Sequence, residues 1–389
     1  MKSLRVRLLA TFTLLGATSA LAQVIPPAPT GPARAQMMQS GIPPGDYGRS
    51  YRTAADIALP NPYYRNETWL KLPKGQSLGA TSAIDIDRDG KSIWLVERCT
   101  GPGGCSVTKN NPIKKFDPDG NLVREFGAGL LVYPHGMWVD RAGNVWISDT
   151  QSNIQKSDGT PNNAPAGTQP KGNHILKFSP TGKLLMQIGT AGEYGSDEHH
   201  FNQPSDVLVS PGGDIFVADG HELVNLPPRI MRFDKTGKFI KAWDVCQASP
   251  VTSDCSHSLA MDSQGRLFVA DRGNAQIIVF DQDGKRLAEW TDWGRPSGIY
   301  IDANDILYAG DSTVGMVEGN AFVRGVHIGS ARTGKVTAFI PDVLGNPAPW
   351  FPLKGTTGPE GVVADKDGII YVSNVAPQGQ VSRYTLRPR

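Results

Sequence analysis

The sequence predicts an all-β protein, a six-bladed β-propeller whose ring is closed by a strand from near the N-terminus. Three observations predict it: one sequence pattern occurs six times, each repeat contains two pairs of β-rich runs, and the last repeat is one run short. Short β-rich segments that recur about every 40 to 70 residues are typical of a ring of four-stranded blades.

The first half of each repeat is a pair of β-rich runs around a turn of Asp and Gly. MWVDRAGNVWISDT at 137–150 shows the pattern, with apolar residues that alternate along both runs. Such runs, joined by a tight turn, predict an antiparallel hairpin. The six segments are 84–98, 137–150, 207–220, 259–272, 299–312 and 362–375.

The second half of a repeat is a further hairpin, with turns such as DPDGN, SPTGK, DKTGK and DQDGK. It is clearest at 113–126, 175–188, 230–243 and 277–290, and looser in the fifth repeat. Two hairpins make a four-stranded meander, whose core is the packing of blade faces through Val, Ile, Leu, Phe and Trp.

The sixth repeat supplies only three strands, VVADK, IIYVS and QVSRYTL, before the chain ends. An unpaired outer edge would invite aggregation. The segment TWLKLP at 68–73 has strand character and precedes the first blade. We therefore expect 68–73 to complete the sixth blade and close the ring.

The ends of the chain predict its destination. Residues 1–22 have a basic start, an apolar stretch and small residues at Ala20 and Ala22, which predict a secretory signal peptide cut after Ala22. Residues 23–66 are rich in Pro, Gly, Ala and Ser and predict an extended leader, followed by the propeller at 67–389. No segment approaches the roughly 20 apolar residues of a membrane span. We expect a secreted or periplasmic protein.

Charge and cysteine content limit the partners and the compartment. A net charge of +2 without a basic cluster argues against nucleic acid as a partner. The four cysteines of an exported chain suggest two disulfides. Three pairings are possible, and the spacing favours Cys99 with Cys105 and Cys246 with Cys255.

One position just before each first hairpin carries the candidate metal ligands. Its occupants, in repeat order, are Ser82, His135, Ser205, His257, Ser297 and Glu360. His135, His257 and Glu360 belong to alternate repeats, so in a closed ring they lie about 120° apart and point at one axis. Two histidines and a carboxylate with an open position suit Zn²⁺ or Fe²⁺.

Further candidates lie where the second strand of each blade ends. A polar residue occurs there in all six repeats, which predicts an architectural role in capping loops; the set is Glu97, Asp149, Asp219, Asp271, Asp311 and Asn374. Arg98 and Arg272 follow two of these residues and can clamp a substrate carboxylate. His221 lies on the same rim as a general base, a further ligand or a surface residue. The loops that expand on this face are 99–112, 150–173, 220–228 and 312–325.

The segments YPHGMWVDRAGNVWISD, FNQPSDVLVSPGGDIFVADG, RIMRFDKTGKFI and HSLAMDSQGRLFVADR resemble the NHL-repeat propellers, and most closely the peptidyl-α-hydroxyglycine α-amidating lyases. This resemblance covers about residues 67–389. It implies a six-bladed propeller that cleaves a carbinolamide N–C bond and releases glyoxylate and a peptide amide. It further implies a zinc ion on three channel histidines, two substrate-facing arginines, a catalytic tyrosine and a structural calcium ion.

Carried over residue by residue, the resemblance matches His135 and His257 to two metal ligands, and Arg98 and Arg272 to the arginines. Three positions depart from the family. Glu360 replaces the third histidine, which lowers the positive charge at the metal and raises the pKa of a bound water. His221 replaces the tyrosine and can substitute as a base. Gly361 replaces an acidic calcium ligand, which counts against the calcium site.

Two functions follow as hypotheses. The first is an exported, metal-dependent lyase-like enzyme in which His135, His257 and Glu360 hold Zn²⁺ or Fe²⁺, Arg98 and Arg272 orient the substrate and His221 transfers a proton. Its partner is a small-molecule or peptide substrate. The alternative is a non-catalytic propeller that binds protein or glycan through its loop-rich face. A calcium-dependent lactonase propeller fits less well, because such sites use acidic and Asn ligands.

Overall fold

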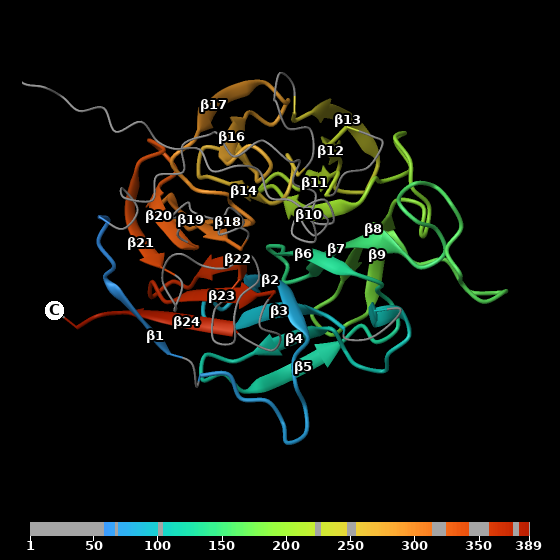
Figure 1. Cartoon of the computed structure of the whole chain (residues 1–389), viewed down its shortest axis with the longest axis horizontal. Coiled ribbons are helices and arrows are strands. Elements are labelled where there is room, and N and C mark those ends of the chain that lie inside the picture. The colour runs from blue at the N-terminus through green and yellow to red at the C-terminus, as the bar shows by residue number, and fades with distance from the viewer. Residues whose placement is uncertain are drawn as a thin grey trace, which may run out of the picture.

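Six four-stranded antiparallel sheets are arranged around a central axis in the computed structural model (Figure 1). The structure describes residues 58–66, 69–99, 104–221, 227–246, 254–312, 324–341, 358–375 and 381–388. Within these ranges the regular elements are strands, apart from one short 3-10 helix, η1 (Gly104–Ser106). The predicted six-bladed, all-β fold is confirmed. The predicted signal peptide, 1–22, and the leader up to residue 57 lie outside the described residues.

The first five blades use four consecutive strands each. Blade one contains β2 (Ala80–Ile86), β3 (Ile93–Arg98), β4 (Ile113–Phe116) and β5 (Leu122–Phe126). Blade two contains β6 (Pro134–Val139), β7 (Val145–Ser152), β8 (Gly172–Phe178) and β9 (Leu184–Ile188). Blade three contains β10 (Pro204–Val209), β11 (Ile215–Asp219), β12 (Arg229–Phe233) and β13 (Phe239–Asp244). Blade four contains β14 (Leu259–Met261), β15 (Leu267–Asp271), β16 (Gln276–Phe280) and β17 (Arg286–Trp290). Blade five contains β18 (Gly298–Ile301), β19 (Ile306–Asp311), β20 (Gly325–Ser330) and β21 (Val336–Pro341).

The sixth blade joins the two ends of the propeller. It contains β22 (Pro359–Ala364), β23 (Ile370–Asn374) and β24 (Val381–Leu386), and its outer strand is β1 (Tyr63–Asn66). β1 runs antiparallel to β24, with Tyr63 opposite Leu386 and Asn66 opposite Arg383. Closure by an N-terminal strand is therefore confirmed. The strand is formed by the last four residues of 23–66, the range that the sequence predicts to be an extended leader.

The expectation that 68–73 forms the closing strand is wrong. Trp69 is 7% exposed and packs its ring against Phe116 of blade one and Tyr371 of blade six. Among the described residues 69–73, only Lys71 makes a ladder contact, an isolated parallel bridge to Asn121. The alternating apolar pattern of 68–73 thus reflects a segment that covers the seam between two blades, a position that also needs apolar residues on one side.

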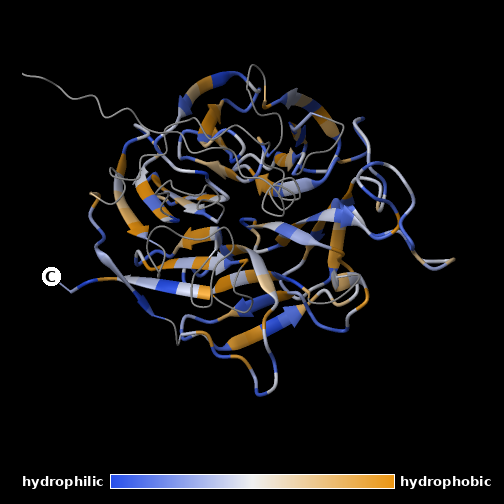
Figure 2. Cartoon of the chain, viewed as in Figure 1, coloured by the Kyte–Doolittle hydropathy of each residue, from blue (hydrophilic) through white to orange (hydrophobic). Residues whose placement is uncertain are grey.

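The hydrophobic core lies between neighbouring blades. One cluster joins Trp94 and Val96 of β3 to Met137 and Val145 of blade two, and equivalent clusters follow around the ring. Apolar and polar residues alternate along many strands in Figure 2, and the outermost strand β13 shows the half-exposed version of that alternation. Burial on both faces of the inner strands holds the first strand of each blade in a fixed register at the axis.

Both predicted disulfides are present. Cys99 is bonded to Cys105 and Cys246 to Cys255, with Cα–Cα distances of 4.8 and 5.8 Å. Cys99 directly follows Arg98, and Cys255 lies two residues before His257. Each bridge therefore constrains the chain beside a candidate site residue. No helix in the described ranges is long and apolar enough to cross a membrane.

Candidate metal centre

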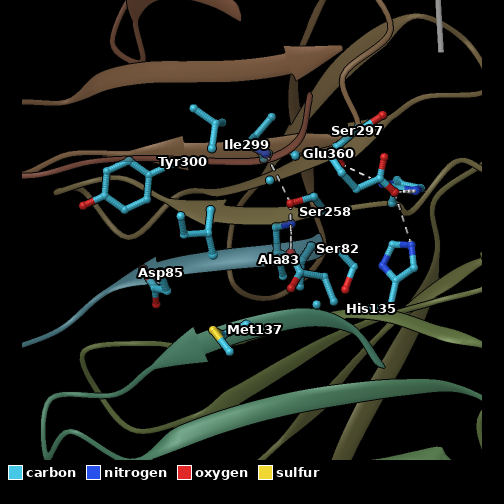
Figure 3. Close-up of a pocket in the computed structure, with 18 of the residues that line it drawn as sticks. Ser82, Ala83, Asp85, His135, Met137, Ser258, Ser297, Ile299, Tyr300 and Glu360 are labelled. Atoms are coloured by element: carbon cyan, nitrogen blue, oxygen red, sulfur yellow. Dashed lines mark hydrogen bonds and ion pairs between the residues drawn. The ribbon is translucent and has the colours of Figure 1, made fainter. Parts of the chain in front are cut away.

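The six residues of the repeated position meet at the centre of the ring. All of them line one central cavity; they are Ser82, His135, Ser205, His257, Ser297 and Glu360. They come from the beginnings of the six innermost strands or the residues directly before them. Figure 3 shows His135 and Glu360 facing each other across this cavity. The repeat register therefore predicted correctly which residues surround the axis.

Hydrogen bonds between blades fix the orientation of both histidines. Nδ1 of His135 lies 2.8 Å from the carbonyl oxygen of Ser205, and Nδ1 of His257 lies 2.7 Å from that of Ser297. A carbonyl oxygen can only accept, so Nδ1 carries the proton in each ring. In the neutral imidazole the lone pair is then on Nε2, which makes no hydrogen bond in either residue. This is the arrangement of a metal-ligating histidine whose other nitrogen is held by the protein.

Glu360 places a carboxylate oxygen between the two histidines. Its Oε1 is 3.6 Å from Nε2 of His135 and 3.7 Å from Nε2 of His257. Its Oε2 accepts a hydrogen bond of 2.7 Å from the Ser312 hydroxyl, which fixes the carboxylate. The side chain is 5% exposed, so the carboxylate is sequestered from bulk water.

His221 completes a group of three histidines. The ligand atoms of His135, His221 and His257 all lie within 4.8 Å of one another, and all three side chains are buried. The His221 ring centroid is 4.3 Å from that of His135 and 5.0 Å from that of His257. The sequence predicts His221 on the rim, as a base, a ligand or a surface residue. The structure places it in the centre of the site.

The donor set fits a metal ion. Two lone-pair nitrogens and a carboxylate oxygen converge with no hydrogen between them, an arrangement that is repulsive without a cation. Tetrahedral bonds of about 2.0–2.1 Å from zinc to nitrogen imply ligand–ligand separations of roughly 3.4 Å. The separations of 3.6 and 3.7 Å from Glu360 are close to that value.

All three histidines are held in the neutral form that binds metal. Burial, followed by the Arg98 cation, lowers the pKa of His135 well below its usual value. Burial and then Arg272 do the same for the pKa of His257. The pKa of His221 is lowered by burial and by the other two histidines.

The two arginines have different surroundings. The Arg98 guanidinium lies 4.5 Å above the Tyr133 ring, and its Nη2 is 3.6 Å from Oε1 of Glu360. Arg272 donates from Nη2 to both carboxylate oxygens of Asp254 at 3.0 Å. Both cations lie close enough to the centre to lower the pKa of His135. Arg98 therefore offers its guanidinium to the site, and Arg272 contributes charge while anchored to an acid.

Three residues of the site escaped the sequence analysis. Tyr133 stacks on Arg98, Asp254 anchors Arg272, and Ser312 binds Glu360. Ser312 occupies the same repeat position as Arg98 and Arg272, directly after the capping residue, so the repeat carried a signal for it. The residue types of Tyr133 and Asp254 do not recur at the matching positions of the other repeats, so no sequence pattern pointed to them.

The polar residues at the end of each second strand have an architectural role, as predicted. Three of them bind the backbone before the innermost strand rather than the loop between the hairpins. Asp149 accepts the backbone N–H groups of Val132 and Tyr133, in the connector that leads into its own blade. Asp219 and Asp311 accept from Asn202 and Arg295 in the same way. These carboxylates fix the chain directly before the innermost strand, and so they hold the candidate ligands in place.

Gly361 leaves little room for the acidic residue that the family resemblance implies there. Its N–H donates to the Ser373 hydroxyl at 3.0 Å, and a Cβ at this position would lie 2.6 Å from that oxygen. A side chain at this position would require the Ser373 hydroxyl to rotate away, and its Cβ would lie 3.2 Å from the backbone of β2 at Ala83 and Ile84.

Comparisons with known proteins agree with this architecture. A model of the NHL repeat matches residues 255–280. Peptidyl-glycine alpha-amidating monooxygenase B of Xenopus laevis is 29% identical over 289 residues, which cover 70% of this chain and 28% of that protein. The probable peptidyl-alpha-hydroxyglycine alpha-amidating lyase pgal-1 of Caenorhabditis elegans is 28% identical over 279 residues, which cover 70% of this chain and 69% of that protein.

A solved gluconolactonase from Xanthomonas campestris shares the fold, with a TM-score of 0.52 at 13% identity over 84% of this chain and 95% of the other. The protein is therefore a six-bladed β-propeller, and residues 255–280 in its fourth blade match the NHL repeat. Among the propellers of that class it resembles the peptidyl-α-hydroxyglycine α-amidating lyases. The chain spans only about a quarter of the length of the Xenopus monooxygenases that it matches.

Proposed function

We propose that the protein is an exported, metal-dependent lyase that cleaves the carbon–nitrogen bond of a carbinolamide. The observation that carries the proposal is the convergence of two lone-pair nitrogens, from His135 and His257, with Oε1 of Glu360. The names of two relatives support the choice of substrate class: peptidyl-alpha-hydroxyglycine alpha-amidating lyase and peptidyl-glycine alpha-amidating monooxygenase. The two disulfides support an oxidising compartment.

His135, His257 and Glu360 would hold the ion, which is Zn²⁺ or Fe²⁺ by the nature of the donors. Three protein ligands leave a coordination position for substrate. When bound, such an ion acts as a Lewis acid toward the hydroxyl group of the substrate. A carboxylate in the set keeps the net charge of the centre lower than three histidines would.

Arg98 binds the carboxylate of the substrate. It reaches the centre from the end of β3, and stacking on Tyr133 fixes the plane of its guanidinium. A planar, two-pronged donor matches a carboxylate and restrains the orientation of the adjoining carbinol carbon. Arg272, anchored by Asp254, adds positive charge on the neighbouring side.

The bond changes need one proton acceptor and one proton donor. The substrate hydroxyl loses its proton as its C–O bond becomes a carbonyl, and the C–N electron pair leaves with the amide nitrogen, which takes up a proton. The products are glyoxylate and an amide. His221 lies against both ligand histidines and is neutral, so it accepts the hydroxyl proton and returns it to the leaving nitrogen.

Elemental analysis of the purified protein tests the proposal together with a glyoxylate-release assay on a peptide that ends in α-hydroxyglycine. We expect about one metal ion per chain and release of glyoxylate. His135→Ala should abolish both, whereas the exposed His199, changed to Ala, should alter neither. A wild-type protein without stoichiometric metal, or a His135→Ala variant with unchanged metal, contradicts the proposal. Metal and glyoxylate release that are both absent would favour the non-catalytic propeller.

A further inference from the structure

A polar groove opens beside the metal centre, between the loops that blades one and two insert on this face. It has a volume of about 770 Å³, within the range of roughly 300–1,000 Å³ typical of ligand sites. One wall is formed by η1 and the residues after it, the other by the loop between β7 and β8, and the floor by Val132 and Tyr133. In Figure 1 the long loop between β7 and β8 projects from the ring beyond β8 and β9.

The floor of the groove is held rigidly by contacts from both walls. The carbonyl oxygen of Val132 accepts the N–H of Cys105 at 3.1 Å, so the disulfide loop is fixed to it. On the other side, a Cβ on Gly172 would lie 2.9 Å from the Val132 side chain and 1.8 Å from a backbone oxygen. The Asp149 carboxylate binds the N–H groups of Val132 and Tyr133 from below. A concavity this constrained is pre-formed for a ligand.

The wall from blade two is ordered by its own hydrogen bonds. Asn153 bridges the loop, because its Oδ1 accepts from the Lys171 N–H at 2.8 Å and its Nδ2 donates to the Gln169 carbonyl at 2.9 Å. The Lys171 ammonium donates to the Gly129 carbonyl at 2.6 Å, which ties the loop to the segment that connects blades one and two. The loop therefore forms a fixed wall.

The groove is continuous with the metal centre through two residues. Tyr133 forms part of the floor, the Arg98 guanidinium stacks on its ring, and Arg98 faces Glu360 at 3.6 Å. A substrate whose carboxylate is bound by Arg98 therefore has this groove beside it, on the far side of Tyr133.

The lining selects a polar chain without positive charge. Five amide side chains line it, together with hydroxyl groups and one lysine, and none of the described lining residues is acidic; the amides are Asn153, which is used within the loop, and Gln151, Asn162, Asn163 and Gln169. An amide side chain offers a donor and an acceptor together, which matches the N–H and C=O of a peptide bond. Resting on the proposed lyase function, we infer that this groove binds the peptide chain on the N-terminal side of the cleaved bond.

Binding can be measured without chemistry by fluorescence anisotropy of a labelled pentapeptide that ends in glycine, which lacks the reactive hydroxyl. Ala164→Trp fills the groove, and the double variant Gln151→Ala/Asn163→Ala removes two amides. Gln264→Ala, in an exposed turn between β14 and β15, is the matched control. We expect both groove variants to bind the pentapeptide at least about tenfold more weakly, the loss that two hydrogen bonds predict, and the control to bind like the wild type.

Cleavage of two substrates separates this inference from the lyase proposal. N-acetyl-α-hydroxyglycine is too short to enter the groove, so Ala164→Trp should leave its cleavage within about twofold of the wild type. A pentapeptide ending in α-hydroxyglycine should lose at least about tenfold in kcat/KM. If no substrate is cleaved but pentapeptide binding is lost in Ala164→Trp, the groove assignment stands and the lyase proposal fails.

The opposite outcome is equally clear. Cleavage that shows no preference for length, with equal pentapeptide binding in all variants, would overturn the groove and leave the lyase intact. An oligosaccharide that binds the wild type but not Ala164→Trp, while the pentapeptide binds neither, would also overturn the peptide assignment.

Discussion

At His135 and His257 the Nδ1 proton is donated to a backbone carbonyl rather than to a carboxylate. A carbonyl carries no charge, so it orients the ring and fixes the tautomer, and its tendency to raise the pKa of the ring is outweighed by burial, which lowers that pKa. The carboxylate is instead placed at the Nε2 side, as Glu360. The negative charge therefore lies where a metal ion would bind, and the groups that orient the two rings are neutral.

His221 distinguishes a proton-transfer role from a ligand role. In the proposed centre His135, His257 and Glu360 hold the ion without His221, so we expect His221→Ala to retain about one metal per chain. We expect its kcat to fall by about 10²–10⁴-fold, the usual contribution of a general acid–base group. Metal analysis and steady-state kinetics on the same preparation check this. A metal-free His221→Ala protein would show that His221 is a ligand, as its place among the three histidines also allows.

Arg98 tests how the substrate carboxylate is recognised. Arg98→Lys keeps a cation near Glu360 but loses the planar fork and the stacking on Tyr133. We expect KM to rise about tenfold or more, because a bidentate contact made in both ground and transition states is lost. Metal content should be unchanged. An unchanged KM would show that Arg98 does not contact the substrate and that its role is confined to Glu360.

At the scale of elements, the closing strand β1 is the most consequential short segment. Tyr63 is 9% exposed and belongs to the cluster between blades five and six, and its backbone pairs with β24. We expect Tyr63→Ala to lower the free energy of unfolding by about 3 kcal/mol, as for other buried aromatic residues. Thermal denaturation measures this. Tyr64→Phe on the same strand is the control, since Tyr64 is 47% exposed and should tolerate the change.

The repeat accounts for what could be predicted from sequence. Because each blade begins its inner strand at the same repeat position, the register alone placed His135, His257 and Glu360 around one axis. The closing strand was misassigned because 63–66 and 68–73 both carry short apolar patterns, and only the space between blades decides which one pairs. His221 lies beside His135 and His257, and Asp254 pairs with Arg272. Both contacts depend on loops that differ between blades, so the periodicity of the sequence does not predict them.

For the whole molecule, the central ring is a closed chain of contacts from blade to blade. Ser82 donates to the Pro134 carbonyl and His135 to the Ser205 carbonyl. Ser205 donates to the Ser256 carbonyl, and His257 donates to the Ser297 carbonyl. Ser312 donates to Glu360, and Glu360 faces Arg98 of blade one. Each blade therefore sets the position of its neighbour's site residue. The proposed metal centre depends on the closed ring, so opening the ring at β1 should weaken metal binding as well as stability.

Two buried carboxyl groups beside this ring predict how stability depends on pH. Burial raises the pKa of Asp85 and of Asp206 to about 7. In the unfolded chain their pKa is about 3.9, so between about pH 4 and 7 the folded state holds more protons. Stability should therefore be greatest at the acidic end of this window and decline as pH rises to 7, by up to about 4 kcal/mol per carboxyl group.

The slope with pH tests this better than absolute stability does, because an amide at either position also alters hydrogen bonds. Asp85 accepts N–H groups from Val139 and Ile86, and an asparagine can satisfy only one of them well. Asp85→Asn should thus destabilise the protein at every pH, yet flatten the decline between pH 5 and 8 measured by urea denaturation. Asp158→Asn, in an exposed turn, should keep the wild-type slope. If Asp85→Asn/Asp206→Asn keeps that slope too, both carboxyl groups are ionised in the folded ring, stabilised by the backbone N–H groups that they accept.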